Sequence, residues 1–468
     1  MKILLSSACL LCLLGSSLFS VEPAAKESPV PWAPGTHLQR TMGLLANSTP
    51  EKRSAVRVLY YGQSITQRGW TDLVTADLRA RFPSAEIIAE NRAIGGFAAD
   101  RLIRTTEADA VNFQPDLMIF HVYGNPTAYE NLLRMVRART AAEVLVMTDH
   151  ATWTPDPSFA YDSEKVKQNA WGDRQVGWLR DLATREHLGY VDIRTGFRSY
   201  ASEQKLRVES LTSDGTHLNA QGCALMARLV SAALVRDASR PTGVPDNAVQ
   251  CLPLPSPASG RMEIPFANAV RLELVFAADA PKSAAIQVKL DGKPATDLPA
   301  LRHHGRTHLV QEEYSGEIPP IFQVSWKQPP AAQTWQLIFD QPLAPDGPYS
   351  FHVAGSLTGP DGKGRTDQEF ISDSGQVWIT PADWNLAYAS WADHLKLDSG
   401  LTILWSTRVT ARDEVVPPTV APGLERAVDV AWDLPPGPHR LELTGPPAAL
   451  ASLEAVRTYA PAKPASPP

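Results

Sequence analysis

Between residues 54 and 240, short apolar runs that suit buried strands alternate with longer segments of helical periodicity. The expected strands are Val56–Tyr61, Glu86–Ala89, Leu117–Val122, Val144–Thr148 and Tyr190–Ile193. The expected helices are Tyr129–Arg139, Val166–Glu186, Gln221–Leu234 and an amphipathic stretch that carries Trp70, Leu73, Val74 and Leu78 on one face. Such alternation produces parallel sheets with helices on both faces. The sequence therefore predicts an α/β domain over residues 54–240.

The pentapeptide Gly-Gln-Ser-Ile-Thr, residues 62–66, directly follows the first expected strand and precedes the amphipathic helix. A serine at such a turn lies at the carboxyl edge of the sheet, where open α/β folds bind their ligands. The N–H groups of a nearby helix N-terminus can stabilise a developing oxyanion. Ser64 taken alone fits the N-cap of that helix at least as well as a nucleophile.

A second motif lies about 150 residues later, where Asp214 precedes His217 by three positions in a loop that enters a helix. Asp214 can accept a hydrogen bond from the imidazole Nδ1, which leaves the other ring nitrogen free to take a proton from a nucleophile. Alone, the pair also fits an N-cap aspartate beside a surface histidine. Together with a serine at a strand edge, the pair favours nucleophilic hydrolysis.

Two further strand ends could supply donors to an oxyanion. The expected strand that starts at Glu86 runs into a Gly95-Gly96 turn, where an unhindered backbone N–H can face a substrate. The strand that starts at Leu117 ends in Gly124-Asn125-Pro126, and this places an amide side chain at the same sheet edge. Asn-Pro is also a common turn signal, so Asn125 fits either a turn residue or an oxyanion donor.

These four blocks, in this order, resemble the SGNH (GDSL-like) hydrolase family over about residues 54–240. By this resemblance Ser64 is the nucleophile, Asp214 and His217 are its partners, and the oxyanion hole is formed by Ser64, Gly96 and Asn125. The resemblance also implies a five-stranded, flavodoxin-like three-layer α/β/α domain. The implied reaction is ester hydrolysis through an acyl-enzyme, with no metal and no organic cofactor.

The sequence departs from the family pattern at two positions. The usual Gly-Asp-Ser is Gly-Gln-Ser here, and the usual Gly-x-Asn-Asp is Tyr123-Gly124-Asn125-Pro126. A glutamine before the nucleophile is also similar to sialate O-acetylesterase-type members. Pro126 removes a backbone N–H and a carboxylate near Asn125. Neither change removes a group that the reaction requires, so the departures concern the subfamily more than the chemistry.

The N-terminus carries Lys2 followed by the apolar stretch Ile3–Phe19, which is typical of a secretory signal peptide over residues 1–20. We therefore expect a secreted or periplasmic protein, with residues 21–53 as a linker or extended strap. No later segment has the ~20 consecutive apolar residues of a membrane span. A formal charge of −6 without any run of Lys or Arg argues against nucleic acid as a partner.

Residues 250–468 are rich in Pro and Gly and carry short strand patterns, which predicts one or two β-sandwich-like units with a break near residues 355–362. The expected strands are Val270–Phe276, Ala285–Leu290, Trp335–Phe339, Gln376–Ile379, Leu401–Thr407 and Arg440–Leu443. Seven tryptophans lie here and either stack on sugars or fill the core: Trp326, Trp335, Trp378, Trp384, Trp391, Trp405 and Trp432. The group His303, His304 and His308 has no Cys or acidic residue at ligand spacing, so no metal site is expected.

Cys223 and Cys251 are the cysteines of the chain after the signal segment, and they form either a disulfide or two buried thiols. An exported α/β hydrolase with a β-rich half resembles esterases that remove acetyl groups from polysaccharides, which makes an acylated glycan the expected partner. One alternative is a lipase or thioesterase of the same family. The other is an inactive glycan-binding surface protein that keeps the hydrolase fold.

Overall fold

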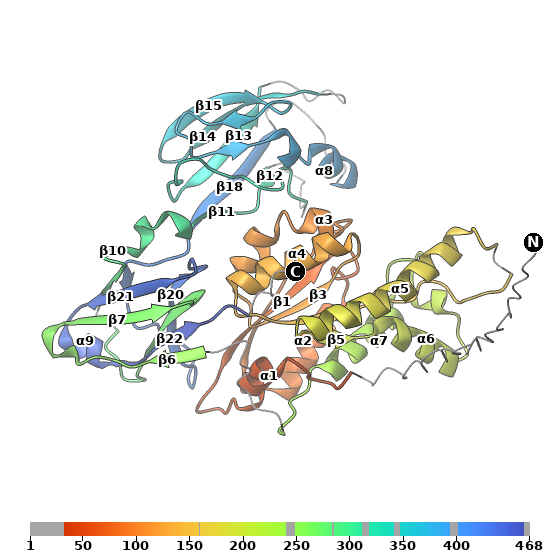
Figure 1. Ribbon diagram of the computed structural model, residues 1–468, viewed down its shortest axis with the longest axis horizontal. Coiled ribbons are helices and arrows are strands. Elements are labelled where there is room, and N and C mark those ends of the chain that lie inside the picture. Colours follow the sequence, from red (N-terminus) through yellow and green to blue (C-terminus); the bar gives the residue numbers. More distant parts are fainter. Residues whose placement is uncertain are drawn as a thin grey trace, which may run out of the picture. The chain divides into compact units, whose positions relative to one another are not determined.

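The computed structural model describes residues 32–158, 160–239, 249–282, 285–310, 318–340, 347–393 and 401–462. Its first sheet has five parallel strands: β1 (Ala55–Gly62), β2 (Glu86–Asn91), β3 (Leu117–His121), β4 (Glu143–Met147) and β5 (Gly189–Val191). The strand order is β2-β1-β3-β4-β5, which is the flavodoxin order. The predicted α/β fold is confirmed, and the carboxyl ends of β1 and β3 lie side by side at the centre of the sheet (Figure 1).

Helices cover both faces of this sheet. One face packs against α1 (Gln39–Ala46), α2 (Trp70–Arg81), α6 (Ile193–Glu203) and α7 (Ala220–Ala233), whose apolar side chains share a core with alternate residues of the strands. The other face carries α3 (Ala99–Leu102), α4 (Pro126–Arg139) and α5 (Glu164–Arg185). There Tyr129 of α4 lies between Phe120 and Trp178, with ring centroids 4.9 and 5.2 Å apart. The inner strands β3 and β4 therefore bury both of their faces, whereas the edge strand β2 leaves Ile88 exposed.

Two expectations for this region were wrong. Residues 21–53 are not simply a linker or strap, because α1 lies within them and buries Met42 and Leu45 in the core. A buried ion pair between Arg40 and Asp116, 3.1 Å apart, attaches this helix to the start of β3. The fifth strand stops at Val191, and Ile193 begins α6. The reason is local, since the Asp192 side chain accepts a hydrogen bond from the N–H of Thr195 and caps the new helix.

The β-rich region begins with a two-sheet sandwich. One sheet has the order β20-β8-β22-β6 and the other β10-β9-β21-β7, with β19 paired to β9. The strands are β6 (Val249–Leu252), β7 (Arg261–Ala267), β8 (Arg271–Phe276), β9 (Ile286–Leu290), β10 (Lys293–Pro294), β19 (Glu414–Val415), β20 (Arg426–Trp432), β21 (Pro438–Thr444) and β22 (Leu453–Tyr459), and α9 (Pro447–Ala451) precedes the last of them. Residues of β7 alternate between buried and exposed, and both sheets contribute to one apolar core.

A third antiparallel sheet of the β-rich region is inserted in the chain between β10 and β19. Its order is β11-β18-β13-β14-β15, with β12 also paired to β18. The strands are β11 (Arg302–His304), β12 (His308–Val310), β13 (Thr334–Phe339), β14 (Ser350–Gly355), β15 (Gly359–Arg365) and β18 (Thr402–Val409). Between β15 and β18 the chain also forms the strand pair β16 (Phe370–Ile371) and β17 (Trp378–Ile379) and the helix α8 (Leu386–Asp393). The expected β-rich architecture is confirmed, but the break near 355–362 was wrong, because those residues form the β14–β15 hairpin.

The two open expectations for tryptophan and cysteine have different outcomes. Trp335 and Trp405 stack with centroids 6.4 Å apart and are fully buried, as core residues would be. The other tryptophans of this half are half-buried, apart from Trp391, whose side chain lies outside the described residues. Cys223 is a buried thiol and Cys251 an exposed one, so the possible disulfide between them is not formed.

Ion pairs join the β-rich region to the α/β part. Arg139 at the end of α4 pairs with Asp433 of the β-rich region and also binds Glu107 of the α/β part at 2.8 Å. His303 of β11 lies 2.8 Å from the same Glu107 carboxylate.

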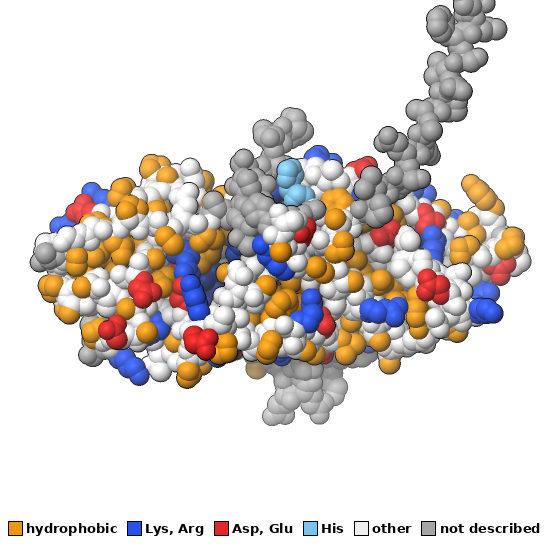
Figure 2. Space-filling model, turned by 90° about the horizontal axis from the view of Figure 1, so that it is seen from below, with side chains coloured by type: hydrophobic (Ala, Val, Ile, Leu, Met, Phe, Trp, Pro, Cys, Tyr) orange, Lys and Arg blue, Asp and Glu red, His pale blue; other side chains and the backbone are white. Residues whose placement is uncertain are grey.

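Acidic and basic side chains are interspersed on the face shown in Figure 2. No helix within the described ranges is long and apolar enough to cross a membrane, and the expected signal peptide, residues 1–20, lies outside those ranges.

Candidate active site

Ser64 lies in a tight turn that follows β1, not in a helix cap. The N–H of Thr66 donates to the carbonyl of Gln63 at 2.8 Å, and the Trp70 indole N–H bonds the Ile65 carbonyl at 2.7 Å. Helix α2 starts only at Trp70 and has Gly69 as its N-cap residue. The alternative of Ser64 as an N-cap is therefore wrong, and its side chain is left for another role at the carboxyl edge of the sheet.

The close approach of β1 and β3 explains the glycine before this turn. A Cβ at Gly62 would lie 2.0 Å from the carbonyl oxygen of His121, so no other residue fits without moving the strand. The N–H of Ile94 also donates to the Gly62 carbonyl at 3.0 Å, which brings the Gly95-Gly96 turn beside the serine turn. Three strand ends that are far apart in sequence thus meet at one edge, as their parallel order requires.

The structure joins Ser64, His217 and Asp214 in one chain of hydrogen-bond contacts. His217 Nε2 lies 3.0 Å from Ser64 Oγ, and His217 Nδ1 lies 2.7 Å from Asp214 Oδ2. An ionised carboxylate can only accept, so Nδ1 carries the proton and Nε2 presents its lone pair to the serine hydroxyl. This is the arrangement in which an imidazole can act as general base toward a serine.

Asp214 is itself held by the backbone of its own loop. Its Oδ1 accepts hydrogen bonds from the N–H of Thr216 at 2.9 Å and of His217 at 2.7 Å. The hydrogen bond from the His217 ring, and then these two backbone N–H groups, hold the pKa of Asp214 far below its ordinary value. Gly215 makes the turn possible with a φ of +83°. The loop thus fixes a charged carboxylate against the imidazole without help from another element.

The three expected oxyanion donors sit on loops that touch each other. The N–H of Ala99 donates to the Tyr123 carbonyl at 2.9 Å, and this fastens the loop after β2 to the loop after β3. Gly96 adopts a φ of +72°, which favours glycine. The backbone N–H groups of Ser64 and Gly96 and the Asn125 amide donate no hydrogen bond to other groups of the described chain. All three are available to a ligand.

Asn125 has a structural task that leaves its donor end available. It is the N-cap of α4, and its Oδ1 accepts the N–H of Thr127 at 2.8 Å and of Ala128 at 3.3 Å. Because the oxygen faces the helix, the NH₂ group points away from it. Pro126 then occupies the first position of the helix, where its missing N–H has no intrahelical partner to lose. The departure from the family pattern at Pro126 is thus absorbed by the helix start.

Two aromatic residues that the sequence did not single out border the site. Tyr388 of α8 donates from Oη to the Gly95 carbonyl at 3.3 Å, so the β-rich region reaches the oxyanion edge. A Cβ at Gly96 would lie 1.6 Å from the hydroxyl oxygen of Tyr388. On the other side, a Cβ at Gly215 would lie 3.0 Å from the ring of Trp153, which covers the turn that holds Asp214. No local sequence signal links these aromatic residues to the motifs.

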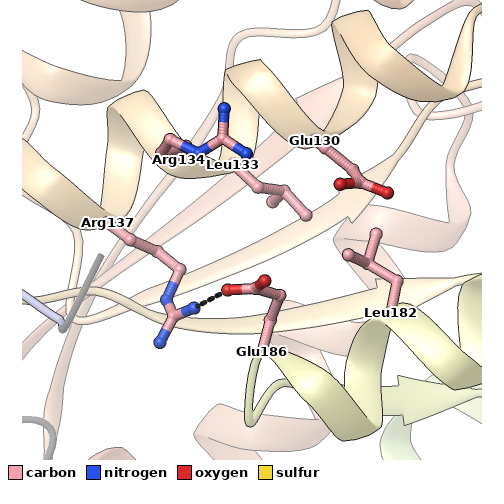
Figure 3. A pocket seen from close by; sticks show the side chains of 6 residues that line it. All are labelled: Glu130, Leu133, Arg134, Arg137, Leu182 and Glu186. Carbon is pink, nitrogen blue, oxygen red and sulfur yellow. Dashed lines mark hydrogen bonds and ion pairs between the residues drawn. The ribbon is translucent and has the colours of Figure 1, made fainter. Parts of the chain in front are cut away.

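A small hollow elsewhere contains none of the expected site residues. It lies between α4 and the end of α5 and is lined by Glu130, Leu133, Arg134, Arg137, Leu182 and Glu186 (Figure 3). Arg137 and Glu186 form an ion pair of 2.7 Å across it. Opposite charges that satisfy each other in this way leave little for a ligand to bind, so this hollow is not a second candidate site.

Residues 60–225 match the model of the GDSL-like Lipase/Acylhydrolase family. No curated protein matches the chain. Among solved structures, the chain is similar to a two-domain esterase active on acetylated mannans, with 17% identity, 55% of this chain and 79% of that chain covered, and a TM-score of 0.35. It is also similar to an acetylxylan esterase from Geobacillus stearothermophilus, with 17% identity, 40% and 97% covered, and a TM-score of 0.32. The expected resemblance to GDSL-like hydrolases is confirmed.

Proposed function

We propose that this chain is a serine ester hydrolase that works through an acyl-enzyme, with residues 54–240 as its catalytic domain and residues 250–468 as an accessory region. The observation that carries the proposal is the contact chain from Ser64 to His217 to Asp214, at 3.0 and 2.7 Å. The GDSL-like match over residues 60–225 supports the same reaction class.

In the proposed acylation, His217 Nε2 takes the hydroxyl proton of Ser64 while Oγ bonds to the ester carbonyl carbon. The carbonyl π pair moves onto oxygen, where the N–H groups of Ser64 and Gly96 and the Asn125 amide stabilise it. The tetrahedral intermediate then collapses, and the leaving alcohol receives the proton from His217. The imidazole, held by Asp214, next activates a water molecule that releases the acid and restores Ser64. His217 carries the proton in both halves: from Ser64 to the leaving alcohol in acylation, and from water back to Ser64 in deacylation.

We propose an O-acyl group on carbohydrate, most simply O-acetyl, as the substrate. The site lies at the surface, because the side chain of His217 is 27% exposed and that of Asp214 is 54% exposed. A surface site admits a polymer that a closed pocket would exclude. Trp153 and Tyr123 are partly exposed beside the loops that carry Asp214 and Asn125, and flat rings of this kind can stack on sugars.

The alternatives are weaker on particular observations. A lipase should offer an apolar surface beside the nucleophile, whereas polar groups of Gln63, His217 and Asn91 contact the turn that carries Ser64. An inactive glycan-binding protein has no need of an imidazole aligned between a serine and a carboxylate. Export by a signal peptide over residues 1–20 stays part of the proposal and is based on Lys2 and the apolar stretch that follows it.

The reaction is tested with a fluorophosphonate probe and a small acetyl ester. The probe should label Ser64, and Ser64→Ala should abolish labelling and lower turnover by several orders of magnitude while the protein stays folded. Labelling that persists in Ser64→Ala would contradict the assignment.

The acyl group and the substrate class are tested separately. In a series of nitrophenyl esters, acetyl should give the highest kcat/KM, with a drop of about tenfold or more for each poorly fitting extension. A preference that rises toward octanoyl would instead favour the lipase or thioesterase. Trp153→Ala should lower kcat/KM on acetylated oligosaccharides and leave nitrophenyl acetate nearly unaffected. Equal losses on both substrates would contradict a sugar-binding role for this ring.

A further inference from the structure

Ser64 contacts a second set of polar side chains besides His217 and Asp214, and this set begins with Gln63. This side chain is 2% exposed. Its Oε1 accepts the N–H of Ile65 at 2.8 Å and lies 3.1 Å from Ser64 Oγ. Because a backbone N–H can only donate, the contact with Ile65 identifies which end of the amide is oxygen. The oxygen end therefore faces the serine, and the NH₂ end faces the protein interior.

The NH₂ end of Gln63 determines the tautomer of a buried histidine. Gln63 Nε2 lies 3.3 Å from Nδ1 of His121, which is fully buried at the end of β3. An amide NH₂ only donates, so Nδ1 of His121 must accept and its proton is on Nε2. That nitrogen lies 2.9 Å from Asp149 Oδ1, in a close contact whose geometry is not that of a hydrogen bond. The order of donors is thus fixed from His121 to Ser64, and Asp149 faces the far nitrogen of the ring.

Asp149 anchors the far end of this array just after β4. Burial by itself would raise the pKa of Asp149, but the contact with the His121 ring N–H, together with nearby positive charge such as that of Arg194, outweighs burial and holds it below its ordinary value. The neighbouring His150 is buried, and this burial lowers its pKa to about 4, so it is neutral at ordinary pH. The His121 ring N–H thus faces a charged Asp149 carboxylate at 2.9 Å.

The Ser64 hydroxyl consequently has two acceptors and one hydrogen. One acceptor is His217 Nε2 at 3.0 Å and the other is Gln63 Oε1 at 3.1 Å. When His217 is neutral, donation to Nε2 is the productive bond. When His217 is an imidazolium, Nε2 can only donate, and the hydroxyl hydrogen must turn to Gln63. Both acceptors lie within hydrogen-bond distance of the same position of Ser64 Oγ.

We propose that Gln63 is a positioning residue for the nucleophile, with its amide held in one orientation by His121 and Asp149. This inference rests on the proposed function, because it assigns a role toward Ser64 as nucleophile. Gln63 exchanges no proton in the reaction: the Oγ–H bond breaks toward His217 Nε2, the new bond forms from Oγ to the carbonyl carbon, and the π pair moves to the carbonyl oxygen. In this chain Gln63 stands at the position where the GDSL-like pattern has an aspartate before the serine.

The first test removes the acceptor and keeps the side-chain volume. In Gln63→Met, both the second-order rate of fluorophosphonate labelling and kcat on a small acetyl ester should fall on the order of 10- to 100-fold, as a misplaced reacting atom costs. KM should stay within about twofold, because the buried Gln63 side chain offers almost no surface to a substrate. A purely structural role would lower the melting temperature without this split between kcat and KM.

The matched control is Gln39→Met. Gln39 in α1 is also 2% exposed, and its amide is bonded to the Gly35 carbonyl at 2.7 Å and the Val235 carbonyl at 3.0 Å, remote from Ser64. It should lose stability comparably and keep the wild-type labelling rate. A control that slows labelling as much as Gln63→Met would overturn the inference.

A double-mutant cycle tests the link to Asp149. Asp149→Asn keeps the shape but can turn an NH₂ toward His121, which moves the ring proton to Nδ1 and sets it against the NH₂ of Gln63, whose oxygen stays on the Ile65 N–H. It should slow labelling several-fold in the wild-type background and less than twofold in Gln63→Met. If the effects of the two substitutions on the labelling rate were additive, the link from Asp149 to Gln63 would be overturned. An Asp149→Asn protein that is labelled at the wild-type rate would also overturn this link, even if Gln63→Met failed to fold. Wild-type protein that is not labelled at Ser64 would contradict the proposed function itself, whereas Ser64 labelling at equal rates in wild type and Gln63→Met would contradict only this inference.

Discussion

Asp214→Asn should damage the proposed enzyme more than Asp214→Ala, although asparagine is the closer analogue in shape. The reason lies in the two oxygens of Asp214. Oδ1 accepts two backbone N–H groups, from Thr216 and His217, while Oδ2 accepts the ring Nδ1–H at 2.7 Å. An asparagine must keep its oxygen on the two backbone donors, because the reverse orientation would set its NH₂ against both of them.

The NH₂ group of the substituted side chain would then face His217 Nδ1 and force that nitrogen to accept. The ring proton would move to Nε2, which lies 3.0 Å from Ser64 Oγ and could no longer take the serine proton. The same tautomer error costs about 10⁴-fold in a buried triad. Here the Asp214 side chain is 54% exposed and water can compete for the amide, so we expect a loss in kcat on the order of 10²- to 10³-fold. Alanine leaves the ring free to adopt either tautomer and should therefore cost less than asparagine does.

The assay is kcat on nitrophenyl acetate for the wild-type, Asp214→Asn and Asp214→Ala proteins, with circular dichroism and the melting temperature as fold controls. Both variants should fold, since the side chain lies at the surface. The tautomer argument is refuted if the asparagine variant is as active as the alanine variant or more active. It is also refuted if the asparagine variant stays within about tenfold of wild type.

Two further predictions separate chemistry from stability. Asn125→Asp keeps the oxygen that caps α4 but removes the amide donor. It should therefore retain the melting temperature and lose on the order of 100- to 1000-fold in kcat. A rise in KM alone would instead make Asn125 a substrate-binding residue. Glu107 is buried, which opposes ionisation, but His303 and Arg139 hold its pKa at about 2, below the usual value near 4.5. Its contribution to stability should therefore be complete above about pH 4.5 and be lost as the pH falls toward 2. Between about pH 5 and about pH 3, the free energy of unfolding in urea should decrease less for Glu107→Gln than for the wild type. Equal decreases would contradict this coupling.

Local patterns were enough to predict the parallel sheet and the edge where Ser64, Gly96 and Asn125 would lie, whereas the family resemblance was what placed His217 beside Ser64. The periodicity of buried strands and covering helices can be read over a few residues, and parallel order places every strand's carboxyl end at one edge. The exclusion of the N-cap role for Ser64 needed the structure, because only the position of Gly69 showed where α2 begins.

Contacts between residues remote in sequence, and the directions of polar side chains, came from the folded chain alone. Tyr388 reaches the Gly95 carbonyl across 293 positions of the chain, and no local pattern encodes that contact. The insertion of one β-sheet into the connection between β10 and β19 likewise depends on which strands pair, and strand patterns alone do not specify partners. The orientation of Gln63 follows from a backbone N–H on one side and a buried histidine on the other. Hydrogen bonds have direction, and only folding brings donor and acceptor into line.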